Sequence, residues 1–412
     1  MENSLNFGIE TADFLTNLFE KYHFSFQEKK QISEFAIDFE AWCEKPIYEY
    51  FDKNLNPNFI KFDKHTHAKE IFVNLRKIWQ DLKQTKHSYA NFKPNLTPKQ
   101  NEISLFSSDK IALGRCPVAS ENTRCCNLLT LDAVQSCGFD CSYCSIQSFY
   151  NGGKIGFNTE FAKNLKNLKL NPNQTYHIGT GQSSDSLMWG DKFGILSALC
   201  EFARVNPNVI LELKSKSDNI KFLLENEIPK NLIATFSLNT PTIVENEEHF
   251  SANLNARLNA AKALSEKGIL VGFHFHPMVW YENYQSEYAE IFANLQSEFD
   301  PQNVACVSFG TLTFIKSVIK KLRERKRKSK ILQMPLCEIN GKFSYPHEIK
   351  KEMFKFAYES FAKWHGKVFF YMCMEEKSLW GECFGYEFGS NDEMERAMKK
   401  AYFEKIALKG AR

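Results

Sequence analysis

The first hundred residues alternate apolar and polar positions with the period of an α-helix. In residues 67–82, isoleucine, leucine and tryptophan recur at helical spacing with charged side chains between them, so the apolar side chains share one face. Residues 27–43 repeat this pattern, and prolines and serines between residues 94 and 108 end it. The pattern predicts a helical N-terminal domain over residues 1–110 whose apolar faces form an ordinary core.

From about residue 126 the pattern changes to short apolar runs separated by helical stretches. Six runs have the length and composition of buried strands, and they cover residues 127–134, 175–181, 208–214, 231–238, 269–275 and 303–309. Helix-like segments such as residues 192–205 and 254–267 lie between them, and Gly268 follows the second as a helix-ending residue. Alternating strands and helices form parallel sheets with right-handed crossovers. We therefore expect an α/β fold, a partial (β/α)6 TIM-like barrel over residues 111–310.

The last hundred residues, 311–412, are mostly helical, with one further β-like run at residues 367–374. A tail of this kind can cover the open side of a barrel and line its substrate site. We expect it to form a C-terminal cap.

The overall composition excludes several classes of protein. Lys and Arg number 52 against 49 Asp and Glu, and this balance leaves a net charge of only +3. The N-terminal sequence has neither a cationic nor an apolar segment, and no apolar run approaches the length of a membrane span. Twelve cysteines in such a chain are expected to be reduced thiols or metal ligands. These features predict a soluble, cytoplasmic protein without a membrane partner.

Cys137, Cys141 and Cys144 stand in a C-x3-C-x2-C spacing just after the first predicted strand. Gly138 and Asp140 allow the chain to curl, so that the three thiolates can converge on one metal. Structural zinc sites and cubane iron-sulfur clusters usually have four protein ligands. Three thiolates leave one coordination position open, where a metal can bind and activate a substrate. The alternative is a zinc knuckle or a buried loop without metal.

The other predicted strands also end in polar, chemically active residues. These ends are Gly179–Asp185, Lys214–Lys216, Ser237–Asn239 and His274–Pro277. Function collects at the carboxyl ends of barrel strands, and the cysteine loop follows the first strand at the same edge. We therefore expect one site there. His274 and His276 alternate on one strand and share a face, either as proton donors inside the barrel or as hydrogen-bonded core histidines.

The cysteine spacing, with Tyr143 before the third cysteine, resembles the cluster loop of radical S-adenosylmethionine (SAM) enzymes. The resemblance implies that the three cysteines hold a [4Fe-4S] cluster and that SAM chelates the fourth iron. One electron, from a flavodoxin or ferredoxin, would then cleave SAM to a 5'-deoxyadenosyl radical. The expected activity is therefore that of a radical SAM enzyme.

The segment from residue 126 to about 300 is similar to spore photoproduct lyase and its DNA-repair-photolyase-like relatives. The similarity rests on the cysteine loop, the S-S-D run at 183–185, Ser215 with Lys216, the S-L-N run at 237–239, and Arg257. It implies a cofactor-binding set that comprises Tyr143 near the adenine of SAM, together with Ser184, Lys216, Ser237 and Asn239. It also suggests a DNA lesion as the substrate, while modified RNA or a peptide stays an alternative.

Two positions depart from the lyase pattern. Gln182 stands where the lyase has its hydrogen-donor cysteine, and Ser145 stands where the lyase has a tyrosine. Because an amide N–H is a poor hydrogen-atom donor, we expect SAM cleavage to be retained and reversal of the thymine lesion to be doubtful.

Two further features leave alternatives open. Cys116, Cys125 and Cys126 could hold an auxiliary cluster, take part in quenching the radical, or be reduced structural thiols. The basic run 316–330 is either a helix that contacts nucleic-acid phosphates or a solvated surface helix. A hypothesis of a different class is a non-catalytic protein in which the three cysteines of the loop and a histidine bind zinc. In that protein the basic run would bind nucleic-acid phosphates.

Overall fold

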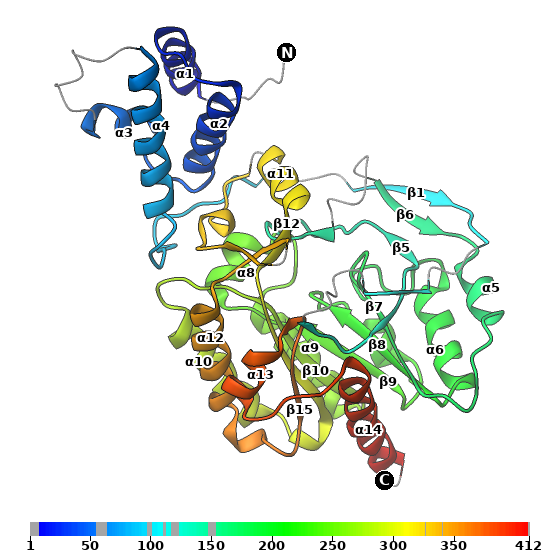
Figure 1. The fold of residues 1–412 in the computed structure, drawn as a ribbon. Coiled ribbons are helices and arrows are strands. Elements are labelled where there is room, and N and C mark those ends of the chain that lie inside the picture. The colour runs from blue at the N-terminus through cyan, green and yellow to red at the C-terminus, as the bar shows by residue number, and fades with distance from the viewer. Residues whose placement is uncertain are drawn as a thin grey trace. The chain divides into compact units, whose positions relative to one another are not determined.

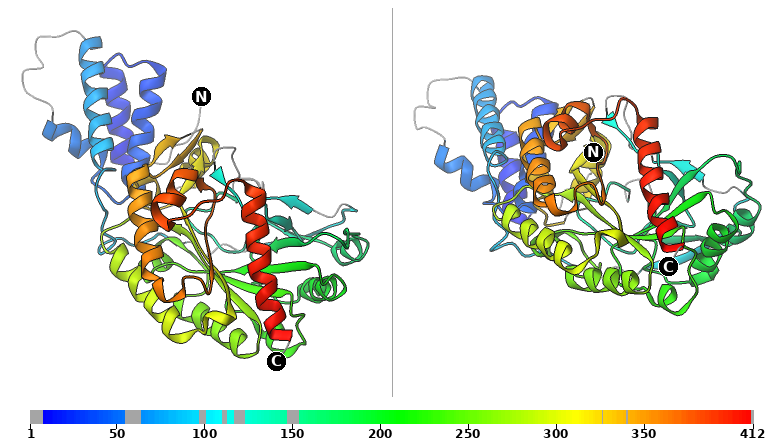
Figure 2. Two further views of the ribbon diagram at one scale, coloured as in Figure 1. Left: turned by 60° about the horizontal axis from the view of Figure 1, so that its bottom comes forward. Right: turned by 90° about the horizontal axis from the view of Figure 1, so that it is seen from below.

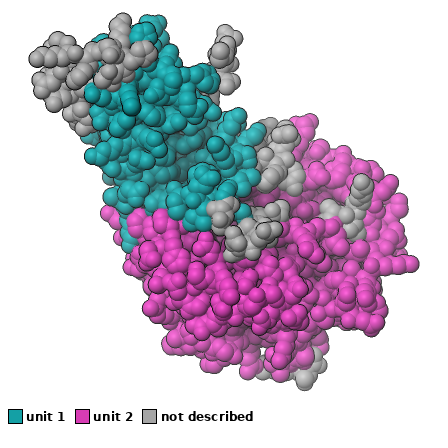
Figure 3. Space-filling model, in the orientation of Figure 1, with its two compact units in different colours: residues 1–96, 314–344 teal, residues 97–313, 345–412 magenta. Residues whose placement is uncertain are grey.

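The computed structural model describes residues 8–54, 64–96, 101–109, 113–116, 123–146, 154–325, 327–339 and 341–410. The chain divides into two compact units, coloured separately in Figure 3. The first unit contains residues 1–96 and 314–344, and the second contains residues 97–313 and 345–412. Residues 314–344 are therefore an insertion in the second unit that folds with the N-terminal segment. The division predicted at residues 110 and 310 stays a prediction.

The N-terminal part of the first unit is helical, as its periodicity predicts. Its helices are α1 (Ile9–Lys21), α2 (Phe26–Ala41), α3 (Ile47–Asn54) and α4 (Lys64–Asp81), shown in blue in Figure 1. Helices α2 and α4 confirm the segments expected at 27–43 and 67–82. Ser25 and Glu28 cap the start of α2 reciprocally, and Ile32, Phe39 and Trp42 are completely buried in the shared core.

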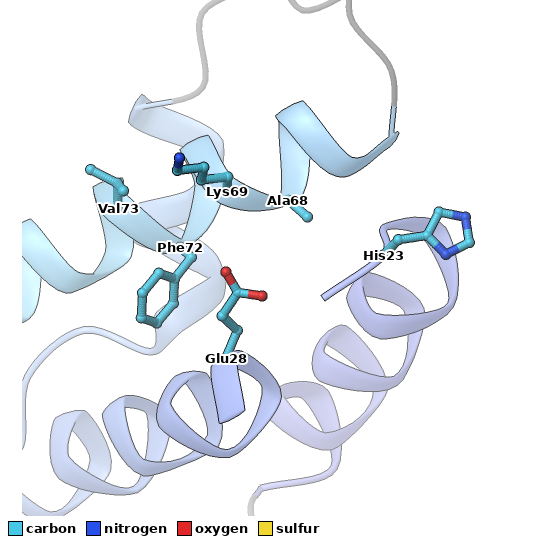
Figure 4. A pocket seen from close by; sticks show the side chains of 6 residues that line it. All are labelled: His23, Glu28, Ala68, Lys69, Phe72 and Val73. Atoms are coloured by element: carbon cyan, nitrogen blue, oxygen red, sulfur yellow. The ribbon is translucent and has the colours of Figure 1, made fainter. Parts of the chain in front are cut away.

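The inserted part of this unit contains α11 (Lys316–Glu324) and the strands β13 (Cys337–Ile339) and β14 (Lys342–Ser344). Strand β14 lies between β13 and β12 (Thr313–Ile315) and pairs with both. A pocket between the N-terminal helices is lined by His23, Glu28, Ala68, Lys69, Phe72 and Val73 (Figure 4). None of the residues that the sequence assigns to the site belongs to this lining.

The second unit is built on an eight-stranded sheet in the order β15-β11-β10-β9-β8-β7-β4-β2. The strands are β2 (Leu113–Arg115), β4 (Leu129–Leu131), β7 (Tyr176–Thr180), β8 (Val209–Ser215), β9 (Leu232–Ser237), β10 (Leu270–Met278), β11 (Val304–Thr311) and β15 (Phe369–Met372). Neighbours pair in parallel except for β2, which is antiparallel to β4. The sheet curls without closing (Figure 2), so the predicted partial barrel is confirmed.

Helices on the outer side of the sheet make the crossovers between the parallel strands (Figure 2). They are α5 (Phe161–Lys166), α6 (Ile195–Val205), α7 (Lys221–Glu225), α9 (Leu254–Glu266), α10 (Tyr284–Glu298) and α12 (His347–Ser360). The short helix α8 (Pro241–Glu247) follows β9 in the same connection as α9. Helices α6 and α9 confirm the segments predicted at 192–205 and 254–267. Gly268, with a φ of +93°, follows α9 as expected. No helix among these described residues, or elsewhere in the described chain, is long and apolar enough to cross a bilayer.

One predicted strand is wrong in detail. Residues 127–134 do not form a single strand: β4 joins the large sheet, whereas β5 (Val134–Gln135) pairs with β6 (Lys154–Asn158) in a small sheet that also contains β1 (Glu102–Phe106). Asp132, between β4 and β5, accepts hydrogen bonds from the backbone and hydroxyl of Ser183. This side-chain contact turns the chain out of the large sheet before the cysteine loop begins.

The C-terminal segment contributes to the barrel itself. The β-like run at 367–374 adds strand β15, and β16 (Glu375–Glu376) pairs with β3 (Thr123–Arg124) before α13 (Lys377–Phe384). The last helix, α14 (Asn391–Gly410), donates hydrogen bonds from Lys399, Lys405 and Lys409 to the carbonyls of Thr175, Val304 and Gly268. These carbonyls lie at the amino ends of β7, β11 and β10. Helix α14 therefore covers the edge opposite to the predicted site.

Gly272, in the middle of β10, has no room for a side chain. A Cβ there would lie 2.9 Å from both the Cys306 sulfur and a Thr235 methyl group. We expect Gly272→Ala to lower the free energy of unfolding by about 1–3 kcal/mol through overpacking. Chemical denaturation would measure it. The control is Gly381→Ala in α13, where nothing lies within 4 Å; equal losses in the two variants would contradict the explanation.

A charged side chain, Glu212 on β8, lies in the barrel interior. It accepts hydrogen bonds from His177 and His274, each at 2.7 Å, and from the Thr235 hydroxyl, also at 2.7 Å. Burial alone would raise the pKa of Glu212, but the two histidine hydrogen bonds hold it well below its usual range. Burial lowers the pKa of His274 to about 4. At neutral pH the interior therefore contains a carboxylate and a neutral His274.

These two pKa shifts predict that acid destabilises the barrel. Because His274 titrates near 4 when folded and near 6.5 when unfolded, the unfolded chain binds more protons between these values. The stability due to His274 is present above pH 6.5 and is lost as the pH falls toward 4, by roughly 3 kcal/mol. The contribution of Glu212 is lost at still lower pH. Urea denaturation between pH 7.5 and 4 would show this loss, and His274→Asn should flatten it; an unchanged slope in that variant would refute the assignment.

Candidate functional site

The cysteine loop follows β5 closely and carries three free thiols. Cys141 is buried, and Cys137 and Cys144 are half-buried. Burial, followed by Asp185 and the Cys144 sulfur, raises the pKa of Cys137 to about 12. Burial also raises the pKa of Cys141, and Cys137 and Cys144 add to this effect. The thiols therefore influence one another electrostatically, and their ligation of one metal stays a prediction.

The curl of the loop has a different cause from the one that the sequence suggests. The positive φ lies at Ser136, at 69°, and not at Gly138. A Cβ at Gly138 would lie 2.4 Å from the terminal methyl of Met188 and 3.0 Å from the Asn101 amide nitrogen. Gly138 therefore packs closely against these two side chains, whose ends would have to move to admit a Cβ.

A second segment, Glu247–His249 after α8, holds the cysteine loop in place. The Asp140 N–H donates to the His249 carbonyl at 3.1 Å, and the Ser142 N–H donates to the Glu247 carbonyl at 2.8 Å. The Ser142 hydroxyl also lies 3.1 Å from Nε2 of His249. These bonds satisfy loop backbone that would otherwise be buried without partners.

A buried ion pair holds Tyr143 in place. Its hydroxyl donates to Glu248, which lies 2.6 Å from Arg257 of α9, and neither charged side chain is exposed. Burial alone would raise the pKa of Glu248, but Arg257 and Lys216 hold it below its usual range. Arg257 also donates to the Ser237 carbonyl at 2.8 Å. The ion pair therefore connects the cysteine loop to the end of β9.

Lys216 follows β8 and brings a positive charge to the loop. Its Nζ lies 5.4 Å from the centre of the Tyr143 ring. Burial alone would lower the pKa of Lys216, but Glu248 and the Cys141 sulfur raise it. A half-buried ammonium beside the thiols can bind a carboxylate.

Asp185, which follows β7, is hydrogen-bonded to the residues at the end of β8. It accepts hydrogen bonds from the Lys216 N–H at 2.6 Å and from the Ser215 hydroxyl at 2.8 Å. The neighbouring Ser184 is buried, and its hydroxyl accepts a bond of 3.3 Å from the Trp189 indole. Both strand ends therefore reach the region of the cysteine loop.

Ser237 and Asn239, after β9, differ in how their polar groups are used. The Ser237 hydroxyl is buried without a hydrogen-bond partner among the described residues, so it has capacity for a ligand. Asn239 is completely buried. Its amide nitrogen donates to the Pro277 carbonyl at 3.0 Å, and its oxygen accepts from Tyr288 at 2.7 Å. A direct role of either residue in cofactor binding stays a prediction.

The basic run at 316–330 is partly used inside the first unit. Arg323 donates to Asp38 at 2.8 Å, and Lys330 is buried and donates to the Trp42 carbonyl at 2.9 Å. The exposed members of the run are Lys316, Lys320, Lys321 and Lys328, and Lys326 lies outside the described residues. Nucleic-acid binding through this run stays a prediction.

The cysteines upstream of the loop lie near a fourth one. The pairing of Arg124 with Glu375 places Cys125 and Cys126 beside Cys373, and the charges of Cys116 and Cys125 help to raise the pKa of Cys373 after burial. Within the described ranges, no three His, Cys, Asp or Glu side chains lie in a group that could hold a metal ion. Ligation here, or in the cysteine loop, would draw the thiols further together.

Sequence reasoning missed the residues that support the loop. Glu248 is one of several acidic residues in the stretch 245–248, and no local pattern distinguishes it from its neighbours. His249 and Asp185 also act through contacts with distant segments. Of these supporting residues, Arg257 and Asp185, the latter within the S-S-D run, carried a signal through the similarity to the lyase.

Known proteins with sequence similarity match the part of the chain that carries this site. The family model for spore photoproduct lyase matches residues 134–359. Spore photoproduct lyase of Clostridium acetobutylicum is 27% identical over 170 residues, which is 39% of this chain and 49% of that protein. The chain thus matches about half the length of this curated relative.

Solved structures agree with this fold. Spore photoproduct lyase complexed with dinucleoside spore photoproduct has a TM-score of 0.53 at 16% identity, over 66% of this chain and 82% of that one. A variant of the lyase with bound AdoMet and the same dinucleoside has a TM-score of 0.53 at 17% identity, with the same coverage. Because the family model spans residues 134–359 of 412, this chain belongs to the spore photoproduct lyase family.

Proposed function

We propose that this protein reductively cleaves SAM at an iron-sulfur cluster held by Cys137, Cys141 and Cys144, and directs the resulting radical to a bound substrate. The observation that carries the proposal is the position of three thiols in one loop at the carboxyl edge of the barrel, beside Lys216. When bound, a [4Fe-4S] cluster would supply the electron that splits SAM into methionine and a 5'-deoxyadenosyl radical.

The residues around the loop fit both groups. Three thiols match a cubane cluster that keeps one iron for another ligand. The Lys216 ammonium suits the carboxylate of SAM, and the buried Ser237 hydroxyl needs a hydrogen-bond partner that SAM can provide. Ser184 can offer its hydroxyl hydrogen, since its oxygen accepts from Trp189.

The protein's own contribution is to position these groups and to exclude water. The ion pair of Glu248 with Arg257 fixes Tyr143, and the Glu247–His249 segment fixes the loop backbone. Helix α14 covers the opposite edge of the barrel. A reactive radical would then meet only the substrate that enters at the carboxyl edge.

The substrate class follows from the relatives. Solved lyase structures contain dinucleoside spore photoproduct, and we propose a pyrimidine lesion in nucleic acid as the substrate class. Modified RNA and peptides are the alternatives. A ferredoxin- or flavodoxin-type protein is the proposed electron donor.

Anaerobic reconstitution tests the proposal. Protein reduced with dithionite in the presence of SAM should be brown, contain about four irons per chain and form 5'-deoxyadenosine. About eight irons would indicate an auxiliary cluster at Cys116, Cys125 and Cys126. A colourless protein with zinc and no deoxyadenosine would overturn the proposal in favour of a non-catalytic zinc and nucleic-acid-binding protein.

The replaced lyase residues make a separate prediction about the product. Because Gln182 and Ser145 offer no good hydrogen-atom donor, we expect the reduced protein with SAM and dinucleoside spore photoproduct to regenerate little thymidine. The lyase from Clostridium acetobutylicum, assayed in parallel by chromatography, is the positive control. Repair at a comparable rate would show that another residue of this chain supplies the hydrogen atom.

A further inference from the structure

A continuous set of hydrogen bonds leads from Glu212 in the barrel interior to His276 at the carboxyl end of β10. Nε2 of His274 lies 2.7 Å from Glu212, and its Nδ1 lies 2.6 Å from the Ser308 hydroxyl of β11. The same hydroxyl lies 3.0 Å from Nε2 of His276. Glu212, His274 and Ser308 are at most 2% exposed, whereas His276 is half-buried.

The carboxylate at one end determines the direction of every bond in this set. Ionised Glu212 can only accept, so His274 must donate its Nε2–H. Neutral His274 then has a lone pair on Nδ1, which accepts the hydroxyl hydrogen of Ser308. The Ser308 oxygen in turn accepts the Nε2–H of His276. The network therefore assigns His276 the tautomer in which Nδ1 carries a lone pair and no proton.

His276 lies beside the proposed cofactor site. Its ring packs against β11 so closely that a Cβ at Gly310 would come within 3.1 Å of it. Lys214 at the end of β8, Lys216 just after it and Glu212 are the charged groups that influence His276, and neutral His274 lies beside it. Lys216 also lies next to Tyr143 and influences Cys141. The Nδ1 atom thus belongs to the same edge of the barrel as the cysteine loop.

We propose that His276 is a substrate-binding residue whose Nδ1 accepts a hydrogen bond from the imide N–H of a pyrimidine, and that Ser308, His274 and Glu212 are positioning residues that keep this nitrogen unprotonated. An imide places an N–H between two carbonyl oxygens. The nitrogen lone pair of His276 suits the N–H, and the adjacent lysines suit the carbonyl oxygens. The inference rests on the proposed function and names the group of the substrate that the site recognises.

Binding of dinucleoside spore photoproduct to the reconstituted protein, without reductant, tests the inference. We expect His276→Phe and Ser308→Ala to weaken binding about 10-fold, as the loss of one buried hydrogen bond would. Ser308→Thr, which keeps the hydroxyl, should restore binding. The histidine control is His347→Phe on α12, where the side chain pairs with Glu382, and its affinity should match that of wild type.

A chemical variant of the probe isolates the imide. Dinucleoside methylated at both imide nitrogens should bind wild type as weakly as the unmodified dinucleoside binds His276→Phe, and His276→Phe should not distinguish the two compounds. If wild type binds both compounds equally, or binds neither, imide recognition is refuted.

The tautomer has a readout that needs no substrate. In protein labelled with ¹⁵N-histidine, the His276 signals, assigned by their absence in His276→Phe, should show protonated Nε2 and unprotonated Nδ1. Ser308→Ala should produce a mixture of tautomers. A protonated Nδ1 in wild type would overturn the inference even if deoxyadenosine forms. Conversely, a failure to form deoxyadenosine would refute the proposed function and leave the tautomer result standing.

Discussion

Replacing Cys141 by alanine is expected to abolish the formation of 5'-deoxyadenosine from SAM. Cys141 is the most buried of the three loop thiols, and the charge of Lys216 acts on its pKa. Changes to groups that merely support a metal ligand cost up to roughly 100-fold in affinity or activity, so loss of a ligand should cost at least about 100-fold. Iron content should fall with the activity, and chromatographic quantification of 5'-deoxyadenosine would measure the effect.

The control for this experiment is another buried cysteine away from the loop. Cys200 on α6 is buried, and Cys200→Ala should retain both iron and deoxyadenosine formation. If Cys141→Ala forms deoxyadenosine at the wild-type rate, the loop does not hold the active cluster. The thiols near Cys373 would then be the next candidates.

The second large effect is expected at the buried ion pair of Glu248 with Arg257, which holds Tyr143. Arg257→Met leaves the Glu248 carboxylate buried without its cation, and breaking such a pair typically costs about 3–5 kcal/mol of unfolding free energy. The same change removes the hydrogen bond from Arg257 to the Ser237 carbonyl. Because Tyr143 is hydrogen-bonded to Glu248, the cysteine loop should also lose order. Chemical denaturation and iron content would report the two consequences.

A matched control comes from the same helix. Lys262 of α9 forms an ion pair with Glu298, but both side chains are 45% exposed. Lys262→Met should therefore change stability little, because solvent screens an exposed ion pair. The double variant Arg257→Met with Glu248→Gln removes the unpaired charge and should recover part of the loss. Equal destabilisation in the Arg257 and Lys262 variants would contradict a special role of the buried pair.

The repeating patterns of the sequence were sufficient for much of the fold. Apolar periodicity identified α2, α4, α6 and α9, and short apolar runs identified the strands from β7 to β11. These elements follow from local physics, because a helix or strand that buries one face must repeat its apolar residues with a fixed period. The single strand expected at 127–134 was wrong because the contact of Asp132 with Ser183 involves a residue 51 positions away.

The candidate site, too, could be predicted from the sequence only in part. Spacing alone indicated the three loop cysteines, since thiols within eight residues can share a metal only through a tight curl. Lys216 and Ser237 follow from the rule that strand ends meet at one edge. Nothing local indicated that Glu248 would anchor Tyr143, because the choice among neighbouring acidic residues depends on where α8 and α9 bring the chain.

The sequence by itself thus determined the curled parallel sheet, the edge at which the candidate site is expected and the thiols proposed for it. Only the tertiary structure decided which distant groups surround those thiols, that α14 would cover the opposite edge, and that His276 would share the Ser308 hydroxyl with His274. The physical reason is the separation along the sequence of the residues that interact. Periodicity and spacing are properties of a few adjacent residues, whereas hydrogen-bond direction, ion pairing and burial depend on groups that only folding brings together.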